Sequence, residues 1–308
     1  MLFEIVLTDK EPPIDRVIHA GVVPRLVACL GMDRYPELQF EAAWALTNIS
    51  SGTSQHARFV VGAGAVPMLV HLLGSPGQDF CEQAVWALGN LGGDSPALRD
   101  TVLNAGALPA LIALVVPECT LSLKRQVVWT LSNLASKKPQ PRFEDVKAAI
   151  PCLCSVLFSD DEEVLTDTCW ALSYLSDGDH SKIQAVLDAG APPRLVELLL
   201  HHSPGVQTPA LRTIGNLVNG DDYQTQIIIN ARALPALKGL LSHHKMGLRK
   251  EAAWTLSNIT AGSKEQIQRV LDVGIGPLLV KVSRLLASQR VHFLFLLTFR
   301  TYATCMFG

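Results

Sequence analysis

Six short segments of this chain each carry an indole followed four residues later by a carboxamide, or a near variant of that pair. A carboxamide offers one acceptor and two N–H donors, which match the N–H and C=O groups of an extended peptide backbone. An indole face attracts a lysine or arginine side chain and packs along its aliphatic stem. These residue types at this spacing predict recognition of an extended basic peptide. The six pairs are Trp44/Asn48, Trp86/Asn90, Trp129/Asn133, Trp170/Tyr174, Arg212/Asn216 and Trp254/Asn258.

Acidic and amide side chains accompany these pairs. We expect Asp94 and Asp167 to meet the charged tips of lysine or arginine side chains. The acidic run over residues 160–163 adds negative charge nearby, and it is explained equally well as a solvated loop between helices. The position three residues before the first member of each pair is held by Glu41, Gln83, Gln126, Asp167, Pro209 and Glu251.

The pairs recur at a nearly constant interval. Successive first members are separated by 42, 43, 41, 42 and 42 residues, and all five tryptophans of the protein occupy this one position. A period of about 40–47 residues is typical of armadillo and HEAT repeats. A proline recurs with almost the same period, in or just after a turn that usually contains glycine. These prolines are Pro24, Pro67, Pro109, Pro151, Pro193, Pro235 and Pro277.

The turn pattern predicts three helices in each repeat. Gly is favoured just past the end of a helix, and Pro is tolerated in the first turn of the next. In one repeat the predicted helices cover residues 96–104, 108–115 and 122–134. Three helices indicate the armadillo plan, whereas a HEAT repeat has two. We therefore predict an all-α armadillo-repeat solenoid, a right-handed superhelix of about six to seven three-helix repeats.

The third helix of each repeat has two distinct faces. At about 100° per residue, Ala42, Leu46 and Ile49 form one apolar stripe. Trp44 and Asn48 share another face, about 140–200° away. Tryptophan is often a core residue, but burial alone does not explain the amide four residues later. We expect the stripe to form the core and the Trp/Asn rows to line a concave surface.

Composition gives no support for a nucleic-acid, membrane or secreted protein. The 308-residue chain has a net charge of −2, which does not suggest a nucleic-acid binder and is equally compatible with an enzyme. No stretch reaches the ~18 apolar residues of a membrane span, and the N-terminus lacks the features of a secretory signal. The seven cysteines are an odd number at irregular spacing, which favours a reducing, intracellular compartment.

Two histidine pairs invite a metal-site interpretation. His201-His202 and His243-His244 lie 42 residues apart, at the same loop position of adjacent repeats, so the repeat accounts for them. Neither pair has a carboxylate or cysteine at ligand spacing. The sequence also contains no G-x-S-x-G, H-E-x-x-H or P-loop motif. We expect no metal, no cofactor and no enzymatic activity.

Trp-x-x-x-Asn rows on armadillo repeats resemble the importin alpha family, the adaptors that carry proteins with classical nuclear localisation signals. The resemblance covers roughly residues 14–277. The two exceptions to the Trp/Asn pairing also match. Importin alpha has Tyr in place of one Asn, as at Tyr174, and Arg in place of one Trp, as at Arg212. Generic armadillo proteins do not share that order.

The resemblance implies a major peptide-binding site and a minor site for the second cluster of bipartite signals. Around the pocket for the key lysine it places Gly52, Gln83 and Asp94. Tyr174 would lie in the linker region between the sites. The major site would comprise Trp44, Asn48, Gly52, Gln83, Trp86, Asn90, Asp94, Trp129, Asn133 and, at its edge, Asp167. The incomplete minor site would comprise Tyr174, Arg212, Asn216, Glu251, Trp254 and Asn258.

Both ends of the chain depart from the family pattern. Importin alpha has an N-terminal basic segment that binds importin beta, and no such cluster precedes the repeats here. Leu296 and Arg300 stand where the next pair is expected. We expect a fragment in three parts: residues 1–15 as the remnant of a preceding repeat, 16–280 as the solenoid, and 281–308 as an apolar tail that is not a repeat.

The sequence therefore favours a nuclear import adaptor that binds Lys/Arg-rich localisation peptides in extended form and shuttles between cytoplasm and nucleus. The alternative is a catenin-like scaffold for adhesion or signalling. Such scaffolds tend to line the groove with Lys and Arg for acidic partners, whereas Trp, Asn and acidic residues recur here. The expected partners are cargo peptides, without nucleic acid or membrane, and importin beta only through the segment that the family carries upstream.

Overall fold

The computed structural model describes residues 14–75, 77–275 and 278, and every regular element in these ranges is a helix. The tail expected over residues 281–308 lies outside the described residues. The remnant expected over residues 1–15 also lies outside them, except for its last two residues, which begin a helix.

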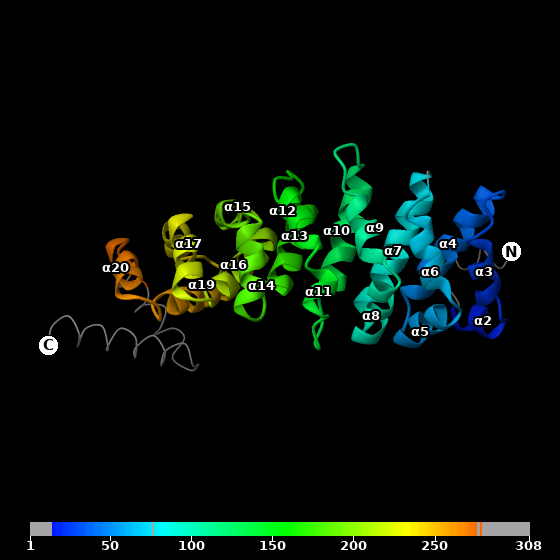
Figure 1. The fold of residues 1–308 in the computed structure, drawn as a ribbon, viewed down its shortest axis with the longest axis horizontal. Coiled ribbons are helices and arrows are strands. Elements are labelled where there is room, and N and C mark those ends of the chain that lie inside the picture. Colours follow the sequence, from blue (N-terminus) through cyan, green and yellow to red (C-terminus); the bar gives the residue numbers. More distant parts are fainter. Residues whose placement is uncertain (1–13, 76, 276–277, 279–308) are drawn as a thin grey trace. The chain divides into compact units, whose positions relative to one another are not determined.

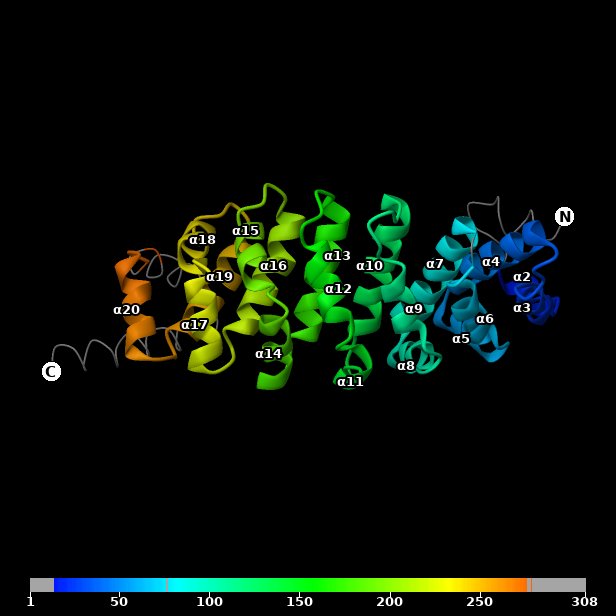
Figure 2. The same ribbon diagram turned by 45° about the horizontal axis from the view of Figure 1, so that its top comes forward.

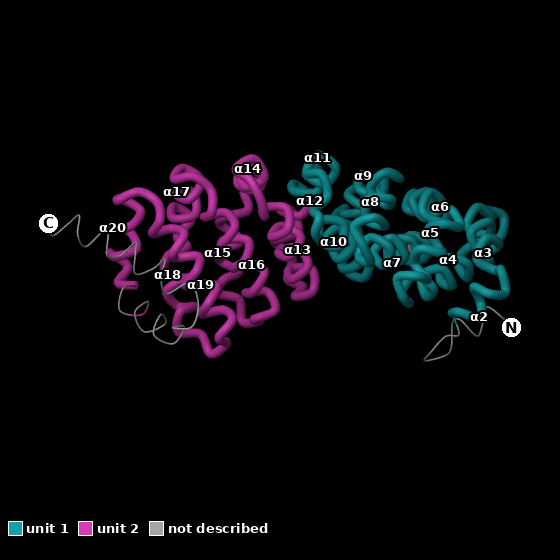
Figure 3. Tube along the Cα trace, turned by 90° about the horizontal axis from the view of Figure 1, so that it is seen from below, with its two compact units in different colours: residues 1–152 teal, residues 153–308 magenta. Residues whose placement is uncertain are grey.

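The described helices fall in two compact units, which Figure 3 distinguishes by colour. The first unit, residues 1–152, repeats an order of two short helices followed by a long one (Figure 1). Its long helices α4, α7 and α10 pack directly on one another in that order. Its helices are α2 (Ile14–His19), α3 (Val23–Cys29), α4 (Pro36–Ser50), α5 (Ser54–Gly62), α6 (Ala65–Leu72), α7 (Gln78–Asp94), α8 (Pro96–Asn104), α9 (Ala107–Ala113), α10 (Leu121–Ala135), α11 (Phe143–Val146) and α12 (Ala149–Val156), the last of which runs into the second unit.

The second unit, residues 153–308, continues the same order. Its long helices α13, α16 and α19 succeed one another in Figure 2, and each packs on the next. Its further helices are α13 (Glu162–Leu175), α14 (His180–Asp188), α15 (Pro192–Leu198), α16 (Pro204–Leu217), α17 (Asp222–Asn230), α18 (Ala233–Leu240), α19 (Met246–Ile259) and α20 (Lys264–Asp272).

The turn between the two short helices requires one residue with left-handed backbone geometry. Gly64, Gly106 and Gly190 supply it with φ values of +85°, +81° and +77°. Glycine has no Cβ, so it adopts this geometry without a steric penalty. Arg232 stands at the same turn of a later repeat with φ +66° and lacks that advantage. The predicted proline then falls in the first turn of the second short helix, as Pro67 does in α6.

The predicted apolar stripe forms the core of each unit. Leu46 and Ile49 on α4 and Leu88 on α7 are fully buried. In unit 2, Leu256 and Ile259 on α19 are buried to the same extent. Burial of this stripe between consecutive long helices is the main favourable contribution to the stability of each unit.

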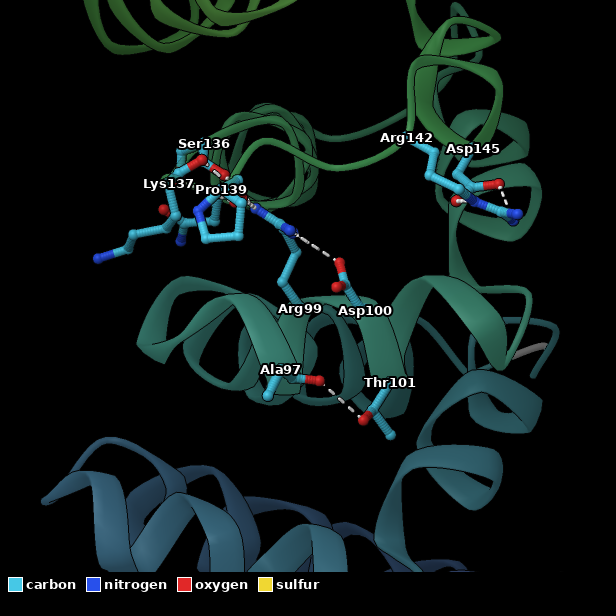
Figure 4. Close-up of polar contacts among 10 residues, drawn as sticks. Ala97, Arg99, Asp100, Thr101, Ser136, Lys137, Pro139, Arg142 and Asp145 are labelled. Atoms are coloured by element: carbon cyan, nitrogen blue, oxygen red, sulfur yellow. Dashed lines mark hydrogen bonds and ion pairs between the residues drawn. The ribbon is translucent and has the colours of Figure 1, made fainter.

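A buried arginine holds the loop at the end of the third repeat (Figure 4). Arg99 on α8 is only 1% exposed. Its Nη1 donates to the carbonyl oxygens of Ser136 and Pro139, each at 2.8 Å, and its Nη2 forms an ion pair with Asp100 at 2.8 Å. A charge is tolerated in the interior when it is paired and hydrogen-bonded in this way. Arg99 therefore fixes the connection between α10 and α11 against α8 of the same repeat.

Candidate functional site

The tryptophans of the predicted rows are accessible to solvent. Trp86 on α7 is 43% exposed, whereas Leu88, two residues later, is fully buried. Because a helix turns about 100° per residue, the two side chains point to different sides of α7. The interpretation of the tryptophans as buried core residues is therefore wrong. The other indoles are also partly exposed, at Trp44, Trp129, Trp170 and Trp254.

Two row asparagines of unit 1, Asn90 and Asn133, are anchored across repeats. Asn90 Nδ2 donates to the carbonyl oxygen of Thr47 at 3.3 Å, and Asn133 Nδ2 donates to that of Gly89 at 3.1 Å. Each amide therefore reaches from its own long helix to the long helix of the preceding repeat. This anchoring fixes which side of the amide is the oxygen. Within the described part of the chain, neither Oδ1 accepts a hydrogen bond, so both stand ready as acceptors.

Asp94 lies at one end of the row in unit 1 and contacts Ser54, two residues after Gly52. Ser54 Oγ donates to Asp94 Oδ1 at 2.5 Å, which brings the last residue of α7 next to the first residue of α5. The other carboxylate oxygen, Oδ2, is buried and has no hydrogen-bond partner among the described residues. A side chain at Gly52 would collide with the ring of His56, so local packing also favours glycine there. A carboxylate oxygen withdrawn from water and left without a donor suits a cationic ligand group.

Gln83 lies elsewhere along the same row. It precedes Asp94 by eleven residues of α7, a separation of about 16 Å along the helix axis. Its backbone carbonyl accepts a hydrogen bond from Thr47 Oγ1 at 3.1 Å. Its side-chain Oε1 is buried without a partner in the described ranges, and so is Oε1 of Gln126 on α10. The structure thus separates Gln83 from Gly52 and Asp94 and provides acceptors at several points along the row.

In unit 2 the row begins on α13. The rings of Trp170 and Tyr174 stack with their centroids 5.9 Å apart. Burial, with a smaller contribution from Glu163, raises the pKa of Asp167 to about 6. Burial and the nearby Asp167 also raise the pKa of Tyr174. Asp167 lies in unit 2, whereas the other residues that the resemblance assigns to the major site lie in unit 1.

Arg212 takes the place of a tryptophan in unit 2 and interacts with the next repeat. Its Cζ lies 6.0 Å from the centroid of the Trp254 ring, and its Nε lies 3.1 Å from Glu251 Oε1. The contact with Glu251 is an ion pair without hydrogen-bond geometry. Burial raises the pKa of Glu251, and Arg212 partly offsets that rise. The chain therefore supplies its own cation to this ring and carboxylate.

The two remaining amides of unit 2 differ from each other. Asn216 Nδ2 donates to the carbonyl oxygen of Ser173 at 2.8 Å, the same anchoring that unit 1 shows. Asn258 Nδ2 is buried and has no partner in the part of the chain that the structure describes. Asn258 thus offers a donor where Asn216 is already held.

Sequence reasoning missed Ser54 and Gly89. Nothing in the sequence pairs Ser54 with Asp94, since 40 residues separate them. The sequence gives one weak indication that Gly89 has a particular role. Other repeats have Thr or Ser at the same register, as at Thr47 and Ser132.

The described residues show no set of three or more His, Cys, Asp or Glu side chains placed to hold a metal ion. The rings of His201 and His202 lie 4.2 Å apart, and those of His243 and His244 repeat that arrangement at 4.2 Å. A search of the same residues for a helix long and apolar enough to span a bilayer finds none.

The chain is similar to known proteins in sequence and in fold. Importin subunit alpha-1a of Oryza sativa subsp. japonica is 58% identical over 204 residues, which are 66% of this chain and 39% of the relative. Importin subunit alpha-4 of Arabidopsis thaliana is 60% identical over 204 residues, which are 66% of this chain and 38% of the relative. The chain thus spans about two-fifths of the length of these curated relatives.

A solved structure extends the comparison. A designed armadillo repeat protein in complex with the peptide (KR)4 superposes with a TM-score of 0.71 at 30% identity, over 77% of this chain and 98% of the design. The family model for the armadillo/beta-catenin-like repeat matches residues 10–51, 53–92, 95–136, 146–177, 179–218 and 221–261. These findings confirm the predicted armadillo-repeat solenoid: the chain belongs to the armadillo/beta-catenin-like repeat family, and its repeats form an armadillo region of the importin alpha type.

Proposed function

We propose that this chain binds lysine- and arginine-rich nuclear localisation peptides in extended form and acts as an adaptor in the import of proteins into the nucleus. The row of unit 1 carries the proposal, because it combines accessible indoles, anchored amides and buried acceptor oxygens without donors. The relatives named importin subunit alpha support the transport role. The (KR)4 peptide bound by the designed armadillo protein supports the ligand class.

The anchored amides bind the peptide backbone in this proposal. Oδ1 of Asn90 and of Asn133 each accepts an N–H of the ligand, and neither amide has to reorient first. Since both are held by the preceding repeat, little side-chain entropy is lost on binding. This recognition is independent of the ligand's side chains, so it suits a family of different cargo peptides.

The indoles and acids supply the preference for basic residues. Lysine and arginine stems pack between successive rings, and the ring faces attract the charged ends by about 0.5–2 kcal/mol each. Asp94 Oδ2 accepts the ammonium of the most tightly bound lysine. The function requires binding and release, and we assign no catalytic residue.

Fluorescence anisotropy with a labelled lysine-rich peptide tests the proposal. Asp94→Lys should abolish binding, because it replaces the acceptor with a cation. Asp188→Lys is the matched control, since Asp188 is exposed on the short helix α14 and the change in net charge is the same. Equal losses of peptide affinity in both variants would show that the effect comes from the net charge of the protein and not from the position of Asp94. Binding of an acidic peptide in place of the basic one would favour the catenin-like scaffold.

A further inference from the structure

Gly89 and Gly215, each one position before a row asparagine, face the indole of the next repeat. A Cβ at Gly89 would overlap Cζ3 of Trp129, and a Cβ at Gly215 would lie 2.7 Å from Cζ3 of Trp254. Real Cβ atoms are essentially never found so close to another heavy atom. In both units, therefore, the indole rests directly on the backbone of the preceding long helix, in space that only glycine leaves free.

The repeat with a threonine at this register has a more exposed indole. Thr47 stands at this register before Trp86, and Trp86 is the most exposed of the row tryptophans, at 43%. Trp129 and Trp254, which follow glycine, are only partly exposed. Trp170, which follows Ser132, is also only partly exposed, so the raised indole is seen with threonine at this register and not with serine.

We propose that Gly89 and Gly215 are specificity-determining residues of the peptide groove. They let the indoles of Trp129 and Trp254 settle against the preceding helix, which sets the depth of the slot for a lysine or arginine stem. A threonine at this register, as at Thr47, raises the next indole and makes the slot shallower. The effect on ligands rests on the proposed peptide-binding function, whereas the effect on the indole does not.

A Cβ at Gly89 would meet the indole of Trp129 and would also lie 2.6 Å from Oγ1 of the buried Thr130, so a control for core packing is needed. Gly92, one turn further along α7, also occupies a tight position, but a Cβ there would lie 2.7 Å from Cδ2 of Leu134 in the core. Gly92→Ala therefore disturbs the same helix pair without touching an indole, and it provides the matched control.

The test begins without any ligand. The protein is labelled with 5-fluorotryptophan, and the Trp129 ¹⁹F resonance is assigned with a Trp129→Phe variant. Gly89→Ser introduces the residue found at this register in Ser132, Ser173 and Ser257, so the helix tolerates it. We expect the Trp129 signal to shift and its solvent isotope effect to grow, while the Gly92→Ala variant leaves it in place. An unchanged Trp129 signal in Gly89→Ser would overturn the proposal, and so would an equal change in Gly92→Ala.

The second part uses a lysine-rich peptide and its single-alanine variants. Gly89→Ser should weaken the intact peptide by about threefold to tenfold. The loss should vanish for the one alanine variant that lacks the lysine packed on Trp129. A loss spread evenly over all peptide positions would overturn the specificity role. If no peptide binds the unaltered protein while the ¹⁹F shift is present, the proposed function fails and the positioning of the indole stands.

The reverse substitution guards against a misfolded variant. Thr47→Gly should lower the solvent accessibility of Trp86 and shift its ¹⁹F signal. If the Trp86 signal stays in place in the folded Thr47→Gly protein, the link between this register and indole depth is refuted.

Discussion

The two units of the molecule build the same row from the same repeat, yet they leave its binding groups in different states. In unit 1 the Trp/Asn pairs are complete, and Asp94 and Gln83 each keep a buried oxygen without a donor among the described residues. In unit 2 the chain's own Arg212 lies over Trp254 and pairs with Glu251. Unit 1 therefore keeps acceptor oxygens available for a cationic ligand. In unit 2 a cation of the chain itself, Arg212, already contacts the corresponding ring and carboxylate.

This difference bears on affinity. A basic ligand entering unit 1 meets acceptors that are already desolvated, so binding relieves a cost that the folded chain carries. A ligand entering unit 2 competes with an existing ion pair and an existing cation–π contact. We therefore expect the stronger peptide site in unit 1, and the following changes test that order.

Among the truncations that compare the two units, the largest effect should come from removing an anchored amide in unit 1. Asn133→Ala deletes both the anchor to Gly89 and the acceptor offered to the ligand. We expect the affinity for a lysine-rich peptide to fall by about 10- to 100-fold. The corresponding change in unit 2, Asn216→Ala, should cost less than about threefold for the same peptide. Titration by fluorescence anisotropy checks this, and equal losses would remove the distinction between the units.

Removing the internal cation of unit 2 should reduce the difference in peptide affinity between the two units. Arg212→Ala uncovers the Trp254 ring and frees the Glu251 carboxylate. Because Arg212 lowers the pKa of Glu251, that pKa should rise in the variant. The weaker of two binding events, measured by calorimetry with a peptide that carries a single basic cluster, should strengthen by about threefold to tenfold. A weaker second event would show that Arg212 contacts the ligand directly.

Acidification should affect unit 2 through Asp167. Burial holds the pKa of this carboxyl near 6, above its ordinary value of 3.8, so the folded state binds the proton more tightly than the unfolded state does. Stability should therefore fall as the pH rises from about 4 to 6, and level off above that range. Asp167→Asn removes this slope. Denaturant melts should show the variant stabilised at pH 7.5 and little changed at pH 3.5. If the free energies of unfolding of the variant and the unaltered protein depend on pH in the same way, Asp167 is not the group responsible.

The smallest effect concerns the turn residue that distinguishes one repeat of unit 2. Arg232→Gly relieves left-handed strain at φ +66°, although glycine also adds freedom to the unfolded chain. We expect a net gain of about 0.5–1 kcal/mol in the free energy of unfolding. Gly106→Arg in unit 1 is the reciprocal change and should destabilise by a similar amount. Thermal denaturation of both variants measures this, and a destabilised Arg232→Gly protein would contradict the strain argument.

Much of the candidate site was predictable from residue type and helical spacing. The burial of Leu46 and the exposure of Trp86 both follow from the turn of the helix, and both are confirmed. The contacts of Arg212 were not predictable in the same way. Arginine at a tryptophan position marks an interruption, but its ion pair with Glu251 depends on how α16 and α19 pack.

The amino-acid sequence alone determined the period, the helix order and the side of each long helix that enters the core. These properties depend on glycine and proline at the turns and on the pitch of the α-helix, which are local. Only the tertiary structure decided that Asn133 is held by the carbonyl of Gly89, and that Trp129 rests on the same residue. Those contacts join residues about 40 positions apart in the chain, and their distances depend on how closely two helices approach.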